Sequence, residues 1–253
     1  MTFPFGDRVA LVTGAGRGIG RAVALGLAQR GARVALLARS ADQLEETAGA
    51  VVARGGRALM VRADLGDPDA VAAAAVRAAS ELGPVDVLVN NAAVVQPAGP
   101  TLATDPGAWA KAWAVNVDAP VRLTLALAPA MRDRGWGRVV NVSSGIVDHP
   151  RAMIGLNAYA ATKAALEAHS LNLAAELSGT GVTVNVYRPG SVDTAMQAWF
   201  RGQSPDEIGA ALHDHFQTSY EEGTLITPEQ SAESLLARLS GDATGEVWIA
   251  TDA

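Results

Sequence analysis

Apolar residues occur along this chain in short runs, and each run is followed by a turn and a longer alanine-rich stretch. The runs are rich in β-branched residues and nearly continuously apolar, which is typical of parallel strands buried on both faces. Alternation of such strands with helical stretches indicates βαβ units. We therefore predict a single α/β domain over residues 1–253, a doubly wound fold of about seven parallel strands with helices on both faces, the strands being Val9–Val12, Val34–Leu37, Ala58–Val61, Val85–Val89, Val139–Val142, Val182–Val186 and Val247–Ile249.

The predicted helices begin with a recurring sequence pattern. A capping residue comes first, often followed by a proline, and then an acid or amide. Asp67-Pro68, Asp105-Pro106 and Thr227-Pro228 are examples. The stretch 195–226 interrupts the alternation of strands and helices, and we interpret it as an insertion with at least one short helix. Insertions that follow the end of a strand commonly cover a site.

Composition narrows the classes of function. The formal net charge of −6 argues against a nucleic acid or an anionic membrane as partner. The absence of cysteine excludes disulfides, thiolate metal sites and cysteine nucleophiles, and the dispersed histidines lead us to expect no metal. The start of the sequence has no basic segment followed by a long apolar one, and we expect a soluble, cytoplasmic protein.

A glycine-rich turn joins the first predicted strand to the first predicted helix. Gly14, Gly18 and Gly20 allow a sharp turn and a close approach to a pyrophosphate, which the helix N-terminus around Arg17 and Ile19 would bind. Such a turn alone is a weak signal, since any tight turn between a strand and a helix favours glycine. Its place at the first strand and first helix favours a dinucleotide site of the Rossmann type.

The second predicted strand ends in Leu37-Ala38-Arg39, where many dinucleotide sites carry an acid that binds the ribose hydroxyls. Ala38 occupies the expected acid position, Arg39 follows it, and Arg17 lies in the glycine-rich turn. Two cations and no acid suit a 2′-phosphate, although Arg39 taken alone could be a solvated residue at the end of a strand. We therefore expect NADP(H) as the cofactor.

Three further residues come together around the fifth predicted strand. Ser144 follows the C-terminal end of that strand, the edge at which ligands bind in open α/β sheets. Tyr159 and Lys163 lie four positions apart in the next predicted helix and so share one face. A Tyr-x-x-x-Lys pair alone is usually an amphipathic surface pair, but this one follows a strand that ends in serine, in a chain with the glycine-rich turn.

These side chains suit proton transfer to or from a carbonyl oxygen. A tyrosine of pKa ~10 is a poor base at neutral pH, and a nearby ammonium and an oxidised nicotinamide ring would both lower that pKa. Lys163 would supply the ammonium and hold the cofactor ribose, Ser144 would hydrogen-bond the substrate oxygen, and Tyr159 would exchange its proton. Asn116 is either a satisfied core amide or a polar group that bends its helix and positions a water near Lys163.

With these residues assigned, the chain resembles the short-chain dehydrogenase/reductases over nearly its full length. The glycine motif of that family matches Thr13, Gly14, Gly18 and Gly20, and its Asn-Ser-Tyr-Lys tetrad matches Asn116, Ser144, Tyr159 and Lys163. The interval between Ser144 and Tyr159 is slightly longer than is usual, so the loop Ile146–Gly155 could reshape the pocket. The resemblance implies further cofactor contacts at Asp64, Leu65, Asn91, Ala92, Pro189, Gly190, Val192 and Thr194.

Within the family, the stretch Val192–Gln197 looks like that of sepiapterin and benzil reductases. The acid that anchors the pterin in sepiapterin reductases has no clear counterpart, since the only acid nearby is Asp252 at the tip of the chain. The resemblance implies an NADPH-dependent oxidoreductase that reduces a ketone or diketone to an alcohol, with Tyr159 as general acid/base. Two alternatives stay open, an NAD(P)⁺-dependent alcohol dehydrogenase working in the oxidative direction and a regulator that senses NADP(H) without turnover.

Two expectations concern surfaces of the molecule. The stretch 195–226 is expected to be a mobile lid that forms much of the substrate pocket, because it carries the apolar residues Met196, Trp199, Phe200, Leu212 and Phe216. We expect a homodimer or homotetramer, since the resemblance implies pairing through the helices around Asp105–Met131 and Tyr159. Both are richer in alanine and leucine than one core-facing stripe requires.

Overall fold

The computed structural model describes residues 4–250, so Asp252 lies outside the described residues. One sheet of seven parallel strands runs in the order β3-β2-β1-β4-β5-β6-β7. All seven predicted strands are confirmed, and their ends lie close to the expected ones. The strands are β1 Val9–Thr13, β2 Arg33–Ala38, β3 Arg57–Arg62, β4 Val87–Asn90, β5 Gly137–Val142, β6 Val182–Arg188 and β7 Val247–Ile249.

The strand order reverses between β1 and β4. The chain starts in the middle of the sheet, moves outward through β2 and β3, and then returns to place β4 beside β1. In open sheets of this kind, ligands bind outside the carboxyl ends of the strands at such a reversal. Every residue of β1 and of β4 is buried, because helices cover the sheet on both sides.

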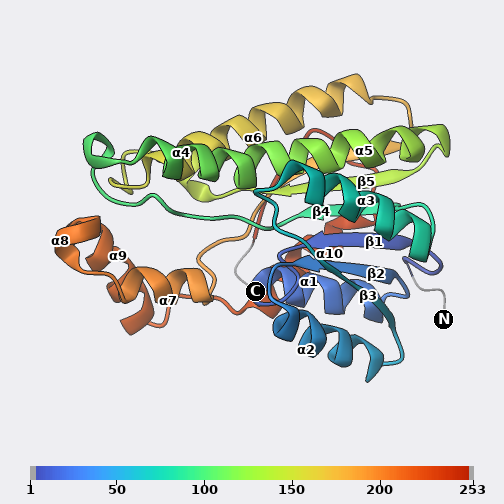
Figure 1. The fold of residues 1–253 in the computed structure, drawn as a ribbon, viewed down its shortest axis with the longest axis horizontal. Helices are drawn as coiled ribbons and strands as arrows, with labels where there is room; N and C mark the ends of the chain where they lie inside the picture. Colours follow the sequence, from blue (N-terminus) through green and yellow to red (C-terminus); the bar gives the residue numbers. More distant parts are fainter. Residues whose placement is uncertain (1–3, 251–253) are drawn as a thin grey trace.

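Two helical layers sandwich the sheet (Figure 1). Leu27 and Leu235 belong to the core on one side, and Val71 and Leu123 to the core on the other. The first layer contains α1 Gly18–Gln29, α2 Ala41–Val52 and α10 Pro228–Leu239. The second contains α3 Pro68–Leu82, α5 Ala119–Asp133 and α6 Asn157–Glu176, and α4 Pro106–Trp113 leads into α5 through a π-helical turn at Ala114–Asp118.

The expected helix starts are confirmed where a polar side chain precedes the proline. Asp67 accepts hydrogen bonds from the main chain of the first turn of α3, and Asp105 does so for α4. Thr227 and Gln230 bond reciprocally at the start of α10, with distances of 2.8 Å and 3.1 Å. These caps satisfy N–H groups that have no partner inside a helix.

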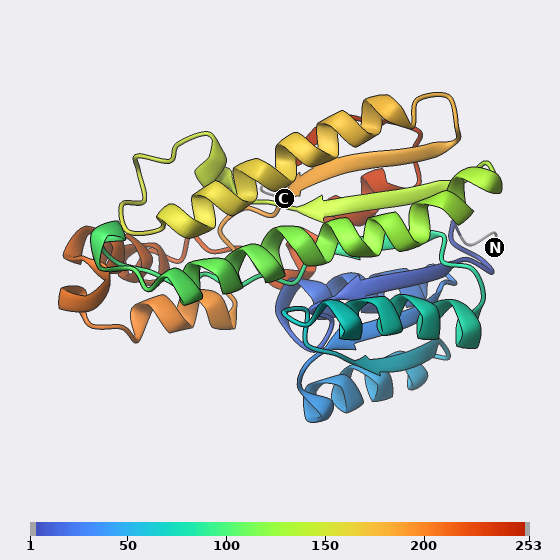
Figure 2. The ribbon, with the colours of Figure 1, turned by 45° about the horizontal axis from the view of Figure 1, so that its top comes forward.

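The segment 195–226 forms helices beyond the carboxyl ends of the strands (Figures 1 and 2). They are α7 Ala195–Arg201, α8 Pro205–Ile208 and α9 Ala210–Glu221. Phe200 and Phe216 stack with their ring centroids 4.1 Å apart. Around this stack lies a third apolar cluster, which also contains Val95 and Ile146 from loops of the main body. The insertion therefore packs onto the sheet domain through a small core of its own. Over residues 4–250, no helix combines the length and apolarity needed to cross a membrane.

Candidate active site

A cavity of about 670 Å³ lies at the carboxyl edge of the sheet, between the strand ends and the segment 195–226. It brings together every predicted site residue except Gly20 and Asn116. Those that line it are Gly14, Arg17, Gly18, Ile19, Arg39, Asp64, Leu65, Asn91, Ala92, Ser144, Tyr159, Lys163, Pro189, Gly190, Val192 and Thr194. Residues distant in sequence thus meet in one place because the parallel strands all end at this edge.

The glycine-rich turn forms the part of the cavity wall between β1 and α1. Gly14 has a φ of +66°, which favours glycine, and a Cβ there would lie 2.8 Å from the Asn91 side-chain nitrogen. Gly20 lies behind the wall, where a Cβ would come 2.3 Å from the Gly14 carbonyl oxygen. Gly20 therefore serves the close packing of α1 against the turn. Gly20 does not line the cavity, and its expected part in cofactor binding stays a prediction.

The start of α1 is suited to an anion. Arg17 occupies the position before the first turn, its side chain makes no capping hydrogen bond, and the first turn holds no acid. The N–H groups of that turn remain available, and the helix dipole adds positive potential there. A pyrophosphate therefore fits this turn, since the glycines leave room for it and nothing in the first turn repels it.

Two arginines stand at the end of the cavity beside β2. Ala38 is the last residue of β2 and lines the cavity with Arg39, which confirms that no acid occupies the strand end. Arg17 and Arg39 are exposed, and neither forms an ion pair within residues 4–250. Both guanidinium groups are therefore free to meet a phosphate ester.

The catalytic candidates lie at the ends of β5 and α6. Ser144 follows β5, and its Oγ accepts a hydrogen bond from the Ile146 main chain at 3.3 Å. Tyr159 and Lys163 lie on the first turns of α6. Lys163 is 2% exposed and its Nζ donates to the Val142 carbonyl oxygen at 2.6 Å, while lying 5.6 Å from the centre of the Tyr159 ring.

Burial shifts both ionisable side chains toward their neutral forms. It raises the pKa of Tyr159 to about 12, although the neighbouring Ser144 hydroxyl acts in the opposite direction. It lowers the pKa of Lys163 to about 8, although the negative charge of Glu167 acts in the opposite direction. Without the cofactor, loss of water around the phenolate therefore decides the direction of the Tyr159 pKa shift. The expected lowering of this pKa by Lys163 and an oxidised nicotinamide together stays a prediction.

Asn116 lies in the π-helical turn and is fully buried. Its Oδ1 accepts from Val94 N at 2.9 Å, and its Nδ2 donates to Val94 O at 2.9 Å and to Thr162 Oγ1 at 3.1 Å. Thr162 in turn donates to the Tyr159 carbonyl oxygen at 2.8 Å. Asn116 does not line the cavity, and its hydrogen bonds connect the loop after β4 to the helix that carries Tyr159 and Lys163.

Sequence reasoning missed several residues of this site. Thr162 could have been noticed as a small polar residue between the tyrosine and the lysine of a buried helix face. Arg188 lines the cavity at the end of β6, where it is a cation at the end of a strand whose residues are all buried. Ile146, Met153 and Leu156 form an apolar wall that comes from the loop between Ser144 and Tyr159. Nothing in the local pattern of that loop indicates which of its residues face inward.

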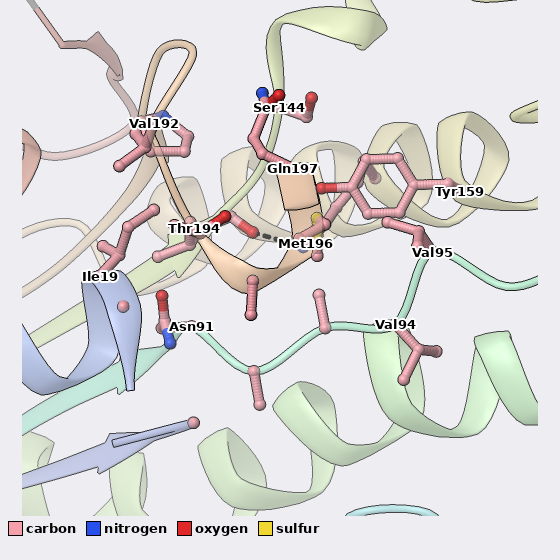
Figure 3. A pocket seen from close by; sticks show the side chains of 18 of the residues that line it. Ile19, Asn91, Val94, Val95, Ser144, Tyr159, Val192, Thr194, Met196 and Gln197 are labelled. Carbon is pink, nitrogen blue, oxygen red and sulfur yellow. Dashed lines mark hydrogen bonds between the residues drawn. The ribbon is translucent and has the colours of Figure 1, made fainter. Parts of the chain in front are cut away.

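The segment 195–226 contributes six residues to the cavity, Ala195, Met196, Gln197, Phe200, His215 and Phe216. Figure 3 shows Met196 and Gln197 on the same part of the wall as Ser144 and Tyr159. Trp199 and Leu212 do not line the cavity, so the expectation that Trp199 contacts the pocket is wrong. Trp199 instead packs edge-on against Phe200, with ring centroids 5.0 Å apart.

The chain matches the family model described as short chain dehydrogenase over residues 8–204. A short chain dehydrogenase of Pseudocercospora fijiensis is 40% identical over 76% of this chain and 62% of that protein. The cis-4-hydroxycyclohexanecarboxylate dehydrogenase of Sinomonas cyclohexanicum is 35% identical over 94% of this chain and 91% of that protein. The crystal structure of L-sorbose reductase from Gluconobacter frateurii, complexed with NADPH and L-sorbose, has a TM-score of 0.87 and 30% identity, covering 98% of this chain and 97% of that one. The chain therefore belongs to the short-chain dehydrogenase/reductase family.

Proposed function

We propose that this chain is an NADPH-dependent oxidoreductase that reduces a ketone or diketone to an alcohol. The observation that carries the proposal is a buried tyrosine hydroxyl, protonated at neutral pH, in one cavity with an anion-binding turn. A protonated group of this kind is suited to donate its proton to an oxygen that gains negative charge.

NADP(H) fits the cavity on the chemistry of its walls. The glycine-rich turn would hold the pyrophosphate, and Arg17 and Arg39 would hold the 2′-phosphate. Asp64, Leu65, Asn91, Ala92, Pro189, Gly190, Val192 and Thr194 line the remaining cofactor path. When bound, the nicotinamide supplies the hydride in reduction or accepts it in oxidation. The NADPH bound to L-sorbose reductase, a protein of the same fold, supports this assignment.

The side chains of this chain divide the proton chemistry between them. Ser144 would hydrogen-bond the substrate oxygen, since its hydroxyl lies at the strand end beside Tyr159 (Figure 3). Tyr159 would donate its proton to that oxygen as negative charge develops. Lys163 would hold the cofactor ribose, and its ammonium would stabilise the phenolate that remains. Asn116 and Thr162 keep the helix turn that carries both residues in place.

The oxidative direction is the second candidate. The Sinomonas relative is named a dehydrogenase, whereas the Gluconobacter structure is named a reductase, so relatives of both directions share this fold. The same residues serve both directions, with Tyr159 accepting the proton in oxidation. A regulator that only senses NADP(H) is disfavoured, because binding alone does not require a hydroxyl acid and an ammonium beside it.

The proposal is tested with Tyr159→Phe in an assay of NADPH oxidation against aliphatic and aryl ketones, 1,2-diketones, quinones and pterins. We expect turnover to fall by about 10²–10³-fold while NADPH affinity is kept, because only the proton donor is lost. Tyr220→Phe is the matched control, since Tyr220 lies on α9 outside the cavity lining and half of its surface is exposed. Turnover close to wild type in Tyr159→Phe would refute the mechanism.

We also propose that the chain forms a homodimer or homotetramer through α4, α5 and α6. Leu125 on α5 is 68% exposed and Leu171 on α6 is 39% exposed, which leaves apolar surface on both helices. Exposed apolar faces usually mark interfaces. Light scattering at micromolar concentration measures the mass directly, and a monomeric mass would exclude the assembly.

A further inference from the structure

Gln197 brings an unused hydrogen-bond acceptor to the cavity. It lies on α7 and lines the cavity, and its Oε1 is buried without accepting a hydrogen bond from any residue among 4–250. Buried amide oxygens normally have a partner, because removal from water without one is destabilising. Among residues 4–250, two residues that line the cavity carry such an unpartnered atom, Ser143 at Oγ and Gln197 at Oε1, and the amide oxygen of Gln197 needs a donor that a ligand can supply.

The surroundings of Gln197 make it a polar point in an apolar wall. Met196, Phe200 and Phe216 of the segment 195–226 line the same cavity, as do Ile146 and Val95, and all five belong to or pack against one apolar cluster. None of these side chains can donate a hydrogen bond to an amide oxygen. Ser144, Tyr159 and His215 line the same cavity and can donate, but none of them bonds Gln197 Oε1, so this oxygen is left for a donor on the ligand.

The position of the amide indicates which part of a substrate it meets. Figure 3 shows the Gln197 side chain extending from α7 toward the part of the cavity where Ser144 and Tyr159 lie. Those two hydroxyls are assigned to the reacting carbonyl oxygen, so Gln197 lies where the neighbouring carbon of the substrate would carry its substituents.

We infer that Gln197 is a specificity-determining residue that selects ketones carrying a hydroxyl on the carbon next to the carbonyl. The hydroxyl donates a hydrogen bond to Gln197 Oε1, while Ser144 and Tyr159 engage the carbonyl oxygen. The inference rests on the proposed reductase function and names its substrate class, α-hydroxy ketones with an apolar remainder. An unsubstituted ketone would leave the amide oxygen unpaired, and sites of this kind reject analogues that lack the bonding hydroxyl.

The test compares matched substrates in wild type and in Gln197→Met, which keeps the side-chain length and removes the amide. The substrates are acetophenone with 2-hydroxyacetophenone, and butanone with 3-hydroxy-2-butanone. The quantity measured is the ratio of kcat/KM for each hydroxy ketone to that of its parent, because intrinsic reactivity cancels when ratios are compared between variants. Gln217→Met is the control, since Gln217 lies on α9, bonds Glu221 and does not line the cavity.

We expect Gln197→Met to lower this ratio by about tenfold or more, because kcat/KM for the hydroxy ketone falls while that for its parent ketone does not. Gln217→Met should leave the ratio unchanged. An unchanged ratio in Gln197→Met, with both parent ketones still reduced, would overturn the inference and leave the proposed function standing. A selective fall in kcat/KM for a 1,2-diketone such as 1-phenyl-1,2-propanedione in Gln197→Met would also overturn the inference. The amide would then act as a hydrogen-bond donor through Nε2, not as an acceptor through Oε1. Absence of NADPH oxidation with every ketone would refute the proposed function itself. Melting temperatures of the variants identify any that fail to fold.

Discussion

Arg188 donates two parallel hydrogen bonds to Glu167, from Nε to Oε1 and from Nη2 to Oε2, each 2.8 Å long. Both side chains are buried, and together they join the end of β6 to α6 one turn beyond Lys163. The third donor of Arg188, Nη1, bonds Asp148 in the loop between Ser144 and Tyr159. The guanidinium of Arg188 therefore connects the end of β6, the helix α6 and the loop between Ser144 and Tyr159.

We predict that Glu167→Gln lowers the free energy of unfolding by about 3 kcal/mol, because it breaks a buried pair and leaves buried Arg188 with only the exposed Asp148 as a charged partner. Urea denaturation measures the effect. Asp148→Asn is the matched control, since its side chain is 51% exposed and a pair of this kind contributes about 1 kcal/mol or less. Equal losses in the two variants would contradict the assignment of Glu167 as the main partner of Arg188.

The sequence predicts the sheet but not the ion pair between Arg188 and Glu167, because the first is a local pattern and the second depends on how distant segments pack. Strands buried on both faces leave a continuous apolar run, and the helices between them begin with caps, so both can be recognised locally. Arg188 finds Glu167 and Asp148 at separations of 21 and 40 residues, and only the packed fold brings them together. The same applies to Asn116, whose partners Val94 and Thr162 lie on other elements.

The second prediction concerns the pH dependence of NADPH binding. The pKa of Lys163 is lowered to about 8, so its side chain is charged below that pH and neutral above it. Affinity for the anionic cofactor should therefore fall as pH rises through about 8, by about tenfold, the contribution of one charge-assisted hydrogen bond. The measurement is the NADPH dissociation constant from fluorescence titration between pH 6.5 and 9.5.

Lys163→Arg provides the control for that experiment, because a guanidinium keeps its charge over this range. Its NADPH affinity should show no fall near pH 8, whatever its turnover. A decline of the same size in both proteins would assign the titration to another group.

The third prediction concerns the proposed lid, the segment 195–226. Met196 lines the cavity and Trp199 does not, so Met196→Ala should change KM or the preference among ketones of different bulk. Trp199→Ala should change that preference less, because Trp199 does not line the cavity and reaches it only through its edge-on contact with Phe200. NADPH affinity should stay within about twofold of wild type in both, as neither residue lies on the cofactor path. A preference that moves only in Trp199→Ala would reverse this assignment.

Met196 and Trp199 also show what the sequence alone cannot predict about this segment. Helical spacing identifies 195–226 as amphipathic and apolar, but it gives no rotation of α7 about its own axis relative to the cavity. The raised pKa of Tyr159 in the chain without cofactor could not be predicted for a similar reason, since the sequence does not show how much water the phenol loses on burial. Both quantities depend on packing between elements that are distant in the chain.

The last prediction is a preference for NADPH over NADH of about tenfold or more in kcat/KM. The two cofactors differ only in the 2′-phosphate. An acid at the end of β2 would accept hydrogen bonds from the ribose hydroxyl and repel that phosphate, but Ala38 occupies this position. Arg17 and Arg39 line the same end of the cavity without ion-pair partners among residues 4–250. One charge-assisted bond of roughly 1.5–3 kcal/mol suffices for a tenfold preference.

The double variant Ala38→Asp with Arg39→Leu should invert that preference, because it restores an acceptor for the ribose hydroxyl and removes one cation. Arg39→Leu alone should weaken NADPH and leave NADH almost unchanged, which separates loss of attraction from gain of repulsion. Arg77→Leu, on the exposed face of α3, controls for the loss of a surface arginine. Wild-type protein that used NADH as well as NADPH would show that neither Arg17 nor Arg39 engages the phosphate. The absence of an acid at position 38 would then remove repulsion of the 2′-phosphate without creating a preference for NADPH over NADH.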